Sequence, residues 1–281
     1  MTYEELLKDA RTRLEQAGVE SAATDAMLIL SRVAKLGSAN IYAVLPEQVP
    51  GDVVNKFRKA LDLRAARKPL QLILGDTVFM GLRFVVDGNE LIPRPDTEIL
   101  VQEAMEIWHR RDEAGEALSV LDICTGSGCI AVSLARYGRF SRVSAGDISE
   151  KALVNARMNA KINKVNIDFE CGDLFAPFAG EKFDIITANP PYIRSGDIDG
   201  LQTEVRDYDP REALDGGEDG LDFYRRIAGE VRDHLREGGS LLLEIGSEQA
   251  EDVSALMSGA GFDKVRVIKD YAGLDRVIVC E

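Results

Sequence analysis

The 281-residue sequence has few of the residues that metal sites and disulfides need. It contains only four cysteines and two histidines. The cysteines lack the paired spacing of metal ligands, and no histidine cluster accompanies them: Cys124, Cys129, Cys171 and Cys280. We therefore expect no metal site, and we expect reduced, mostly buried thiols in a cytoplasmic protein.

Long apolar runs are also missing. No stretch approaches the length of a membrane span, and residues 1–5 do not begin a basic region followed by an apolar one. These absences predict a protein that is neither secreted nor bound to a membrane. Hydrophobic residues make up 45% and charged residues 29%, as in soluble globular proteins, and the length suits one large domain plus a small one.

Positive charge is scarce in most of the chain, and the formal net charge is −14. Residues 1–75 carry 11 lysines and arginines against 9 acidic residues, whereas the remainder carries 23 against 39. A region with this excess of negative charge repels a phosphate backbone. We therefore expect no direct nucleic-acid substrate. One basic cluster has helical spacing and is interpreted as a solvated helix face: Lys56, Arg58, Lys59, Arg64, Arg67 and Lys68.

Two regions differ in their periodicity. Residues 1–75 show a capping-box pattern at Thr2 and apolar residues at helical spacing, which predict a small helical domain. This domain has no catalytic constellation, so we interpret it as a docking domain for a substrate. Residues 76–92 are expected to form a β-hairpin linker, preceded by a short strand at residues 72–74.

Residues 93–281 are expected to form an α/β domain. Alternation of strands and helices implies a doubly wound, mostly parallel sheet with helices on both faces. The last two strands are separated only by residues 271–274 and should form an antiparallel hairpin. The expected strands are 119–123, 142–146, 167–170, 184–188, 240–245, 264–270 and 275–280, and the expected helices are near 128–137, 149–162, 221–237 and 247–260.

A glycine-containing loop follows the first strand of this sheet. Two glycines let the backbone approach a ligand closely and expose N–H groups at a helix N-terminus. Asp147 ends the second strand, from which an acid can bind ribose hydroxyls. On these residues alone a dehydrogenase stays open as an alternative. The expected cofactor loop is Cys124, Thr125, Gly126, Ser127 and Gly128.

Two further acids flank this expected cofactor site. Asp173 after the third strand could bond an adenine amino group while Leu174 packs on the ring, and a turn-capping role for Asp173 is equally open. Asp122 could fix the glycine loop.

The sequence Asn189-Pro190-Pro191-Tyr192 directly follows an expected strand. The lone pair of a planar –NH2 group is delocalised, and a site that accepts both N–H bonds favours its nucleophilic geometry. Asn189 offers a side-chain oxygen and Pro190 a backbone carbonyl, which Pro191 keeps out of a helix. Tyr192 offers a flat ring for stacking. Hydride transfer has no use for this tetrad, so we expect alkylation, with Asn189 also beside the cofactor.

The tetrad and glycine loop occur with several other motifs: residues 68–75, 92–98, 147–149, 209–211, 213–214, 216–222 and 243–246. With these motifs the chain resembles, over nearly its whole length, the PrmC/HemK family of protein-(glutamine-N5) methyltransferases. The resemblance implies a class I S-adenosylmethionine-dependent methyltransferase fold. It also implies methyl transfer to the glutamine of the Gly-Gly-Gln loop of peptide chain release factors.

The resemblance assigns the glycine loop, Asp147 and Leu174 to the cofactor and Asn189 to Tyr192 to the glutamine. Residues 94–98 would shape the wall of the site, where a general base at Glu98 is possible and unnecessary. Three positions depart from the family pattern: Cys124 replaces a glycine, Leu72 a common tyrosine, and Leu174 a larger aromatic residue of some relatives.

Three other functions fit the sequence less well. Adenine-N6 DNA methyltransferases use a similar tetrad, but they need a recognition region and a basic cleft. Glutamine methyltransferases of a ribosomal protein differ after the arginine of the segment at residues 93–98. A cofactor-binding protein without catalysis would not need the intact tetrad.

Overall fold

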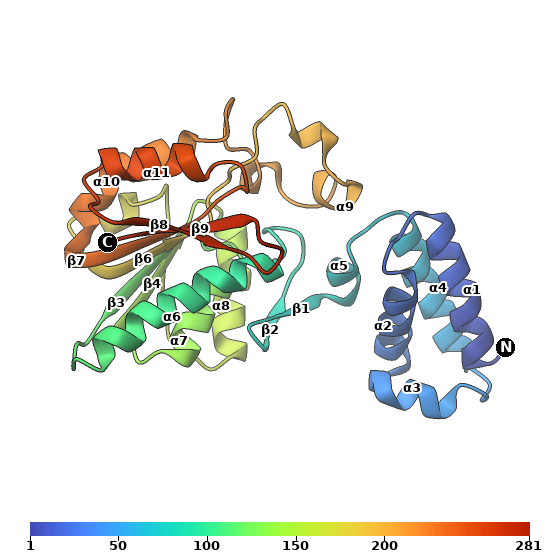
Figure 1. The fold of residues 1–281 in the computed structure, drawn as a ribbon. Coiled ribbons are helices and arrows are strands. Elements are labelled where there is room, and N and C mark those ends of the chain that lie inside the picture. Colours follow the sequence, from blue (N-terminus) through green and yellow to red (C-terminus); the bar gives the residue numbers. More distant parts are fainter. The chain divides into compact units, whose positions relative to one another are not determined.

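The computed structural model describes residues 1–281, with the side chain of Ser38 as the exception. The chain divides into two compact units (Figure 1). The first comprises Met1–Asp76 together with Gln202–Tyr208, and the second comprises Thr77–Leu201 together with Asp209–Glu281. The first unit therefore contains a short segment from deep within the sequence of the second.

The first unit is helical, as the sequence predicts. Thr2 caps the first helix: its hydroxyl accepts from the Glu5 N–H at 3.2 Å, and its own N–H donates to the Glu5 carboxylate at 2.9 Å. One apolar core, which includes Leu6, Ile29 and Phe57, joins the longer helices. The helices are α1 Tyr3–Gln16, α2 Ala22–Ala34, α3 Ser38–Val44, α4 Gly51–Ala65, α5 Leu70–Leu74 and α9 Thr203–Arg206.

The strand expected at residues 72–74 is wrong, because these residues belong to α5. Pro69 precedes the helix, and Gly75 ends it in a left-handed conformation with φ 78°. The Gly75 N–H donates to the Gln71 carbonyl at 2.8 Å, which closes the last turn. A short apolar run fits a strand and a buried helical turn equally well, so periodicity could not separate them.

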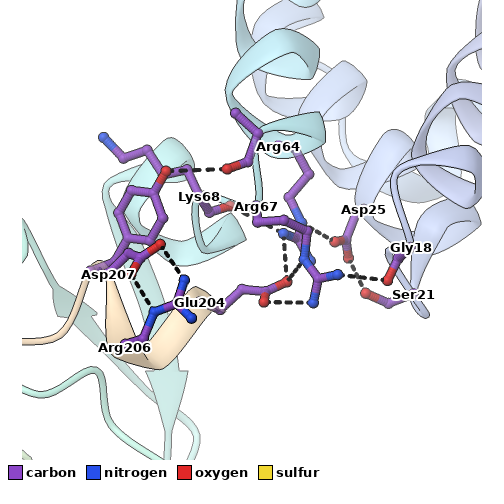
Figure 2. Close-up of polar contacts among 11 residues, drawn as sticks. Gly18, Ser21, Asp25, Arg64, Arg67, Lys68, Glu204, Arg206 and Asp207 are labelled. Carbon is purple, nitrogen blue, oxygen red and sulfur yellow. Dashed lines mark hydrogen bonds and ion pairs between the residues drawn. The ribbon is translucent and has the colours of Figure 1, made fainter. Parts of the chain in front are cut away.

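The interpretation of the basic cluster is wrong for Arg64 and Arg67 (Figure 2). Arg64 is buried, and its guanidinium donates to Asp25 at 2.7 Å and to Glu204 at 3.1 Å. The half-buried Arg67 donates to both carboxylate oxygens of Glu204, at 2.6 and 2.7 Å, and to the Gly18 carbonyl at 3.0 Å. Their acidic partner lies about 140 residues away in the sequence, so helical spacing could not reveal it. The expected exposed face holds for Lys56, Arg58 and Lys59.

The second unit contains the expected hairpin and the expected sheet. Strands β1 Asp76–Phe79 and β2 Leu82–Val85 pair by themselves. Seven other strands form one sheet in the order β5-β4-β3-β6-β7-β9-β8. Neighbours from β5 to β7 are parallel, and β9 is antiparallel to both β7 and β8. Their bounds are β3 Ser119–Ile123, β4 Arg142–Asp147, β5 Asp168–Cys171, β6 Phe183–Ala188, β7 Leu235–Glu244, β8 Val265–Lys269 and β9 Asp275–Cys280.

Helices cover both faces of this sheet (Figure 1). Val120 of β3 belongs to the core that α6, α7 and α8 share. Its neighbours Leu121 and Ile123 belong to the core beneath α10 and α11. Among the described residues, no helix combines the length and the apolar character needed to cross a membrane. The helices are α6 Glu98–Asp112, α7 Cys129–Tyr137, α8 Glu150–Ile162, α10 Asp222–His234 and α11 Ala250–Gly259, with the 3-10 turns η1 Pro95–Thr97, η2 Ala176–Phe178, η3 Ile198–Gly200 and η4 Arg211–Ala213.

The helix expected to reach residue 237 ends at His234, because Leu235 already pairs with Phe183 as the first residue of β7. The strand order itself locates a binding crevice. Strand β3 has β4 on one side and β6 on the other, so successive connections diverge at this point. In open α/β sheets, ligands bind beyond the carboxyl ends of the strands at such a switch point. The loops after β3 and β6 are the glycine loop and the tetrad.

Candidate active site

A cavity of about 250 Å³ lies at the carboxyl ends of β3, β4 and β6. Tetrad residues Asn189 and Pro191 line it, and so do seven of the other residues predicted to bind a cofactor: Cys124, Thr125, Gly126, Ser127, Asp147, Asp173 and Leu174. The structure thus brings together residues that are up to 67 positions apart in the sequence. Among the described side chains, no group of three or more histidine, cysteine or acidic residues could hold a metal ion.

Three predicted residues lie behind the described cavity lining. Gly128 has φ 78°, and a Cβ there would lie 3.1 Å from the Cβ of Ala156, so this glycine lets α7 approach α8 closely. Pro190 is buried. Tyr192 is half-buried and packs against the second core, and its carbonyl accepts from the Gln249 side chain at 3.0 Å.

Asp122 holds the glycine loop in place, in agreement with one interpretation of the sequence. This fully buried residue accepts hydrogen bonds from the hydroxyls of Thr125 at 2.5 Å and Thr187 at 2.8 Å. Burial raises the pKa of Asp122 to about 7, and the two hydroxyl donors partly oppose that rise. The carboxyl ties the loop to β3 and β6.

Asp147 holds the same loop from the end of β4. One carboxylate oxygen accepts from the Gly126 N–H at 2.7 Å, and the other accepts from the Ser149 N–H at 2.9 Å. Burial raises the pKa of Asp147, and these backbone donors counteract it in part. The carboxylate therefore lies at the cavity wall with a fixed orientation and can accept further hydrogen bonds from a ligand hydroxyl.

Two backbone positions in the cavity wall are left-handed without being glycine. Cys124 has φ 55° and Leu174 has φ 47°. A left-handed conformation at residue 124 agrees with the glycine that the family pattern has there. Burial raises the pKa of the Cys124 thiol, so it stays neutral. Next to Leu174, Asp173 pairs with Arg226 at 2.6 Å at the exposed rim of the cavity.

Glu90 is a site residue that the sequence did not reveal. It lines the cavity with 2% of its surface exposed, and it accepts from the Asn155 side chain at 3.0 Å and from the Asp87 N–H at 3.3 Å. Burial raises the pKa of Glu90 to about 7, while the Asn155 bond lowers it in part. A lone acid before an apolar segment carries no signal of burial, so sequence analysis could not find it.

Thr97 lines the cavity as part of the wall expected at residues 94–98, whereas the contacts of Thr97 and Glu244 with the tetrad were not predicted. The Asn189 amide nitrogen donates to the Thr97 hydroxyl at 3.4 Å. Glu244 ends β7 and is 2% exposed, and its Oε2 has no hydrogen-bond partner. Burial raises the pKa of Glu244 to about 7, and hydrogen bonds from the Thr97 and Asn189 side chains partly offset this rise.

The segment at residues 94–98 forms part of the wall, and Arg94 lines the cavity. The Arg94 guanidinium pairs with the buried Asp209, which joins two sequence motifs that lie 115 residues apart. Burial raises the pKa of Asp209, and the charge of Arg94 opposes that rise. Glu98 instead accepts from the Met80 N–H at 2.6 Å.

Glycines at residues 216–220 support the tetrad from outside. The Ile193 N–H donates to the Leu214 carbonyl at 2.9 Å, and the Gly216 N–H donates back to Ile193 at 2.8 Å. A Cβ on Gly216 would lie 2.8 Å from the Tyr192 Cα, and one on Gly220 would lie 2.5 Å from the Tyr192 carbonyl oxygen. The close backbone contact thus fixes the path of the chain after the tetrad.

Comparison with known proteins gives matches for both units. Residues 5–75 match the PrmC N-terminal domain family, and residues 97–204 match the methyltransferase small domain family. The chain is 40% identical over 277 residues to a release factor glutamine methyltransferase of Geobacter sulfurreducens, covering 99% of this chain and 95% of that one. A protein of the same name from Moorella thermoacetica is 41% identical over 279 residues, covering 98% and 97%.

Solved structures of other methyltransferases share the fold. A methyltransferase from Pyrococcus furiosus superimposes with a TM-score of 0.53 at 19% identity, covering 80% of this chain and 97% of that one. A 16S rRNA N2 G1207 methyltransferase of T. thermophilus, solved with AdoMet and guanosine, has a TM-score of 0.51 at 18% identity, covering 73% and 49%. These similarities, with the strand order, confirm the predicted class I methyltransferase fold.

Proposed function

This chain belongs to the release factor glutamine methyltransferase family, and we propose that it transfers a methyl group from S-adenosylmethionine to a peptide chain release factor. The acceptor is N5 of the glutamine in the Gly-Gly-Gln loop. The observation that carries the proposal is that Asn189 lines the same cavity as the glycine loop and Asp147. An acceptor for amide hydrogens therefore lies beside a cofactor pocket.

The residues of the cavity fit S-adenosylmethionine. The buried Ser127 hydroxyl has no hydrogen-bond partner among the described residues, as expected for a group that meets a ligand. The glycine loop would hold the cofactor's carboxylate with N–H groups other than those of Thr125, Gly126 and Gly128, which already donate within the protein. Asp147 would hold its ribose, and Asp173 and Leu174 its adenine. When bound, the cofactor supplies an electrophilic methyl group on a sulfonium centre.

The tetrad would act on the glutamine side chain. Asn189 would accept one of its N–H bonds from the cavity wall, and the carbonyl of Pro190, directly behind that wall, would accept the other. Pro191 keeps that carbonyl available, and the Tyr192 ring would stack on the amide plane. These acceptors favour the pyramidal nitrogen that occurs only in the transition state, so they lower the barrier more than they strengthen substrate binding. The nitrogen would form the new N–C bond as the S–CH3 bond breaks and S-adenosylhomocysteine leaves, and the cationic nitrogen would then release a proton, so a dedicated general base is unnecessary.

The helical domain, residues 1–75, would dock the protein substrate, and residues 76–92 would connect it to the methyltransferase domain of residues 93–281. Release factors act in translation, which supports our proposal that the enzyme is cytoplasmic. The acidic charge of residues 76–281 disfavours a nucleic-acid substrate, and no membrane partner is proposed.

Methyl transfer from labelled S-adenosylmethionine tests the proposal. A release factor, a ribosomal protein and DNA are offered separately to the full-length chain. We expect label on the release factor, at the glutamine of the Gly-Gly-Gln loop. Label on the ribosomal protein or on DNA in place of the release factor would overturn the assignment of the substrate.

A further inference from the structure

We propose that Thr97 and Glu244 form a relay that fixes the orientation of the Asn189 side-chain amide, so that its oxygen faces the substrate. The inference rests on the proposed function, because it concerns the group that would accept the glutamine N–H. Thr97 and Glu244 act through Asn189 and are therefore positioning residues. The three lie on separate elements: the turn η1, the loop after β6 and the end of β7.

The side-chain amide of an asparagine can adopt two orientations that differ by a half turn. The two ends of an asparagine side chain have nearly the same shape, but one accepts hydrogen bonds and the other donates two. If the amide of Asn189 were turned round, its N–H groups would face the N–H groups of the glutamine, and both would lose their bonds. A catalytic asparagine therefore needs neighbours that select one orientation.

The hydrogen bonds of Asn189 and Thr97 have a defined direction. The Asn189 nitrogen donates to the Thr97 hydroxyl at 3.4 Å, which leaves the hydroxyl proton free to donate elsewhere. Thr97 is 2% exposed, and hydrogen bonding by the Thr97 and Asn189 side chains lowers the pKa of the neighbouring Glu244 carboxyl. An ionised carboxylate only accepts hydrogen bonds, so in the relay the Thr97 hydroxyl and the Asn189 amide nitrogen both direct their protons toward Glu244.

Glu244 is an unusual residue to bury. Its Oε2 lacks any partner, and a buried acid without full hydrogen bonding is costly unless it serves a purpose. The guanidinium of Arg276 is near it but is held by Asp270 at 3.0 Å and by the Ile245 carbonyl at 3.3 Å. Glu244 therefore forms no ion pair among the described residues, and its carboxyl, when ionised, can accept the hydrogen bonds of the relay.

Substitution of Thr97 tests the relay. Thr97→Val keeps the shape but removes the hydroxyl, and Thr97→Ser restores the hydroxyl as the matched control. We expect kcat with the release factor to fall about 10- to 100-fold in T97V and to recover most of its value in T97S. The affinity for S-adenosylhomocysteine, measured by calorimetry, should change less than about threefold in both. Melting temperatures show whether each variant is folded.

The charge of Glu244 gives a second measurement. Protonated Glu244 can donate as well as accept, so it no longer fixes the direction of the relay. We expect the kcat of the wild type to fall below about pH 7, the pKa that burial gives Glu244, and the kcat of E244Q to be low and independent of pH there. The other titratable or charged groups around Glu244 are Asp96, Cys129, Tyr192, Tyr224 and Arg276.

The outcomes separate the relay from the proposed function. A wild type that methylates no release factor contradicts the function. An active wild type together with a folded T97V of equal kcat overturns the relay alone. An E244Q variant that keeps the wild-type fall in kcat at low pH would also reject it, because that fall would then belong to another group.

Discussion

At the scale of single residues, Asn189 combines three constraints. It begins the loop after β6 at the cavity, its nitrogen donates to Thr97, and its oxygen remains available to a ligand. In the proposed reaction, the residue would therefore contribute through the orientation of a single hydrogen-bond acceptor, its side-chain oxygen. Removal of a group that stabilises the charge of a transition state usually causes a large loss of kcat.

Truncation of this side chain should separate chemistry from binding. In Asn189→Ala the glutamine loses one of its two acceptors, so we expect kcat to fall at least about 100-fold. Cofactor affinity should fall only a few-fold, since the glycine loop and Asp147 remain. Single-turnover kinetics and calorimetric titration with S-adenosylhomocysteine measure the two effects. An equal loss in both would assign Asn189 to cofactor binding instead.

At the scale of elements, the sheet and its flanking helices could be predicted from the sequence because their signals are local. Apolar runs such as residues 184–188 and the helical repeat of residues 149–162 are periodic within one segment. The strand predicted at residues 72–74 was wrong for the opposite reason. A run of three apolar residues is too short to show a period. Glu244 and Arg64 depend on neighbours far apart in the sequence, so their burial could not be predicted from local patterns.

The glycines behind the tetrad provide a test of packing at this scale. Gly220 has φ 78°, and an added Cβ would lie 2.5 Å from the Tyr192 carbonyl oxygen. We expect Gly220→Ala to lower the free energy of unfolding by about 2 kcal/mol or more and to reduce kcat, because the tetrad must shift.

Gly180→Ala is the matched control for this substitution. Gly180 has φ 79° with nothing within 4 Å of an added Cβ, so it carries the backbone strain without the collision. Denaturant unfolding and kcat are measured for both variants. If Gly180→Ala reduced kcat as much as Gly220→Ala does, contact with Tyr192 would not be the cause.

The pairing of Glu204 with Arg64 and Arg67 gives a prediction for α9. Burial disfavours the ionised carboxyl, but the hydrogen bonds from the two arginines outweigh it and lower the pKa of Glu204. The pair therefore stabilises the first unit at neutral pH, and this stabilisation is lost as the pH falls through the lowered pKa. Glu204→Gln should destabilise that unit by about 1 to 3 kcal/mol.

Thermal unfolding at several pH values measures this effect. The difference between wild type and Glu204→Gln should shrink toward acidic pH, since both side chains are then neutral. The exposed Glu47, on the same unit, serves as control, and Glu47→Gln should change stability by less than about 0.5 kcal/mol. A difference for Glu204→Gln that stays constant with pH would exclude the ion pairs as its source.

At the scale of the whole molecule, the chain crosses between the two units at residues 76–77, 201–202 and 208–209. The first domain boundary is marked in the sequence by the end of the helical pattern. The insertion of residues 202–208 into the first unit is not marked, because it depends on Glu204 meeting arginines far away in the sequence. Removal of residues 1–75 therefore removes the partners of Glu204 as well as any docking surface.

The proposed docking role of the first unit can still be tested separately by comparing two substrates. We expect the chain without residues 1–75 to lose at least about tenfold in kcat/KM for an intact release factor, because the docking contacts are lost. A short peptide that contains Gly-Gly-Gln should be methylated with little change, since the cavity and tetrad lie in the second unit. Full-length Glu204→Gln is the control, because it breaks the ion pairs and keeps the surface. This control could lose as much activity on the intact release factor as the truncated chain does. In that case the loss of the ion pairs that hold α9, and not the loss of a docking surface, would explain the result.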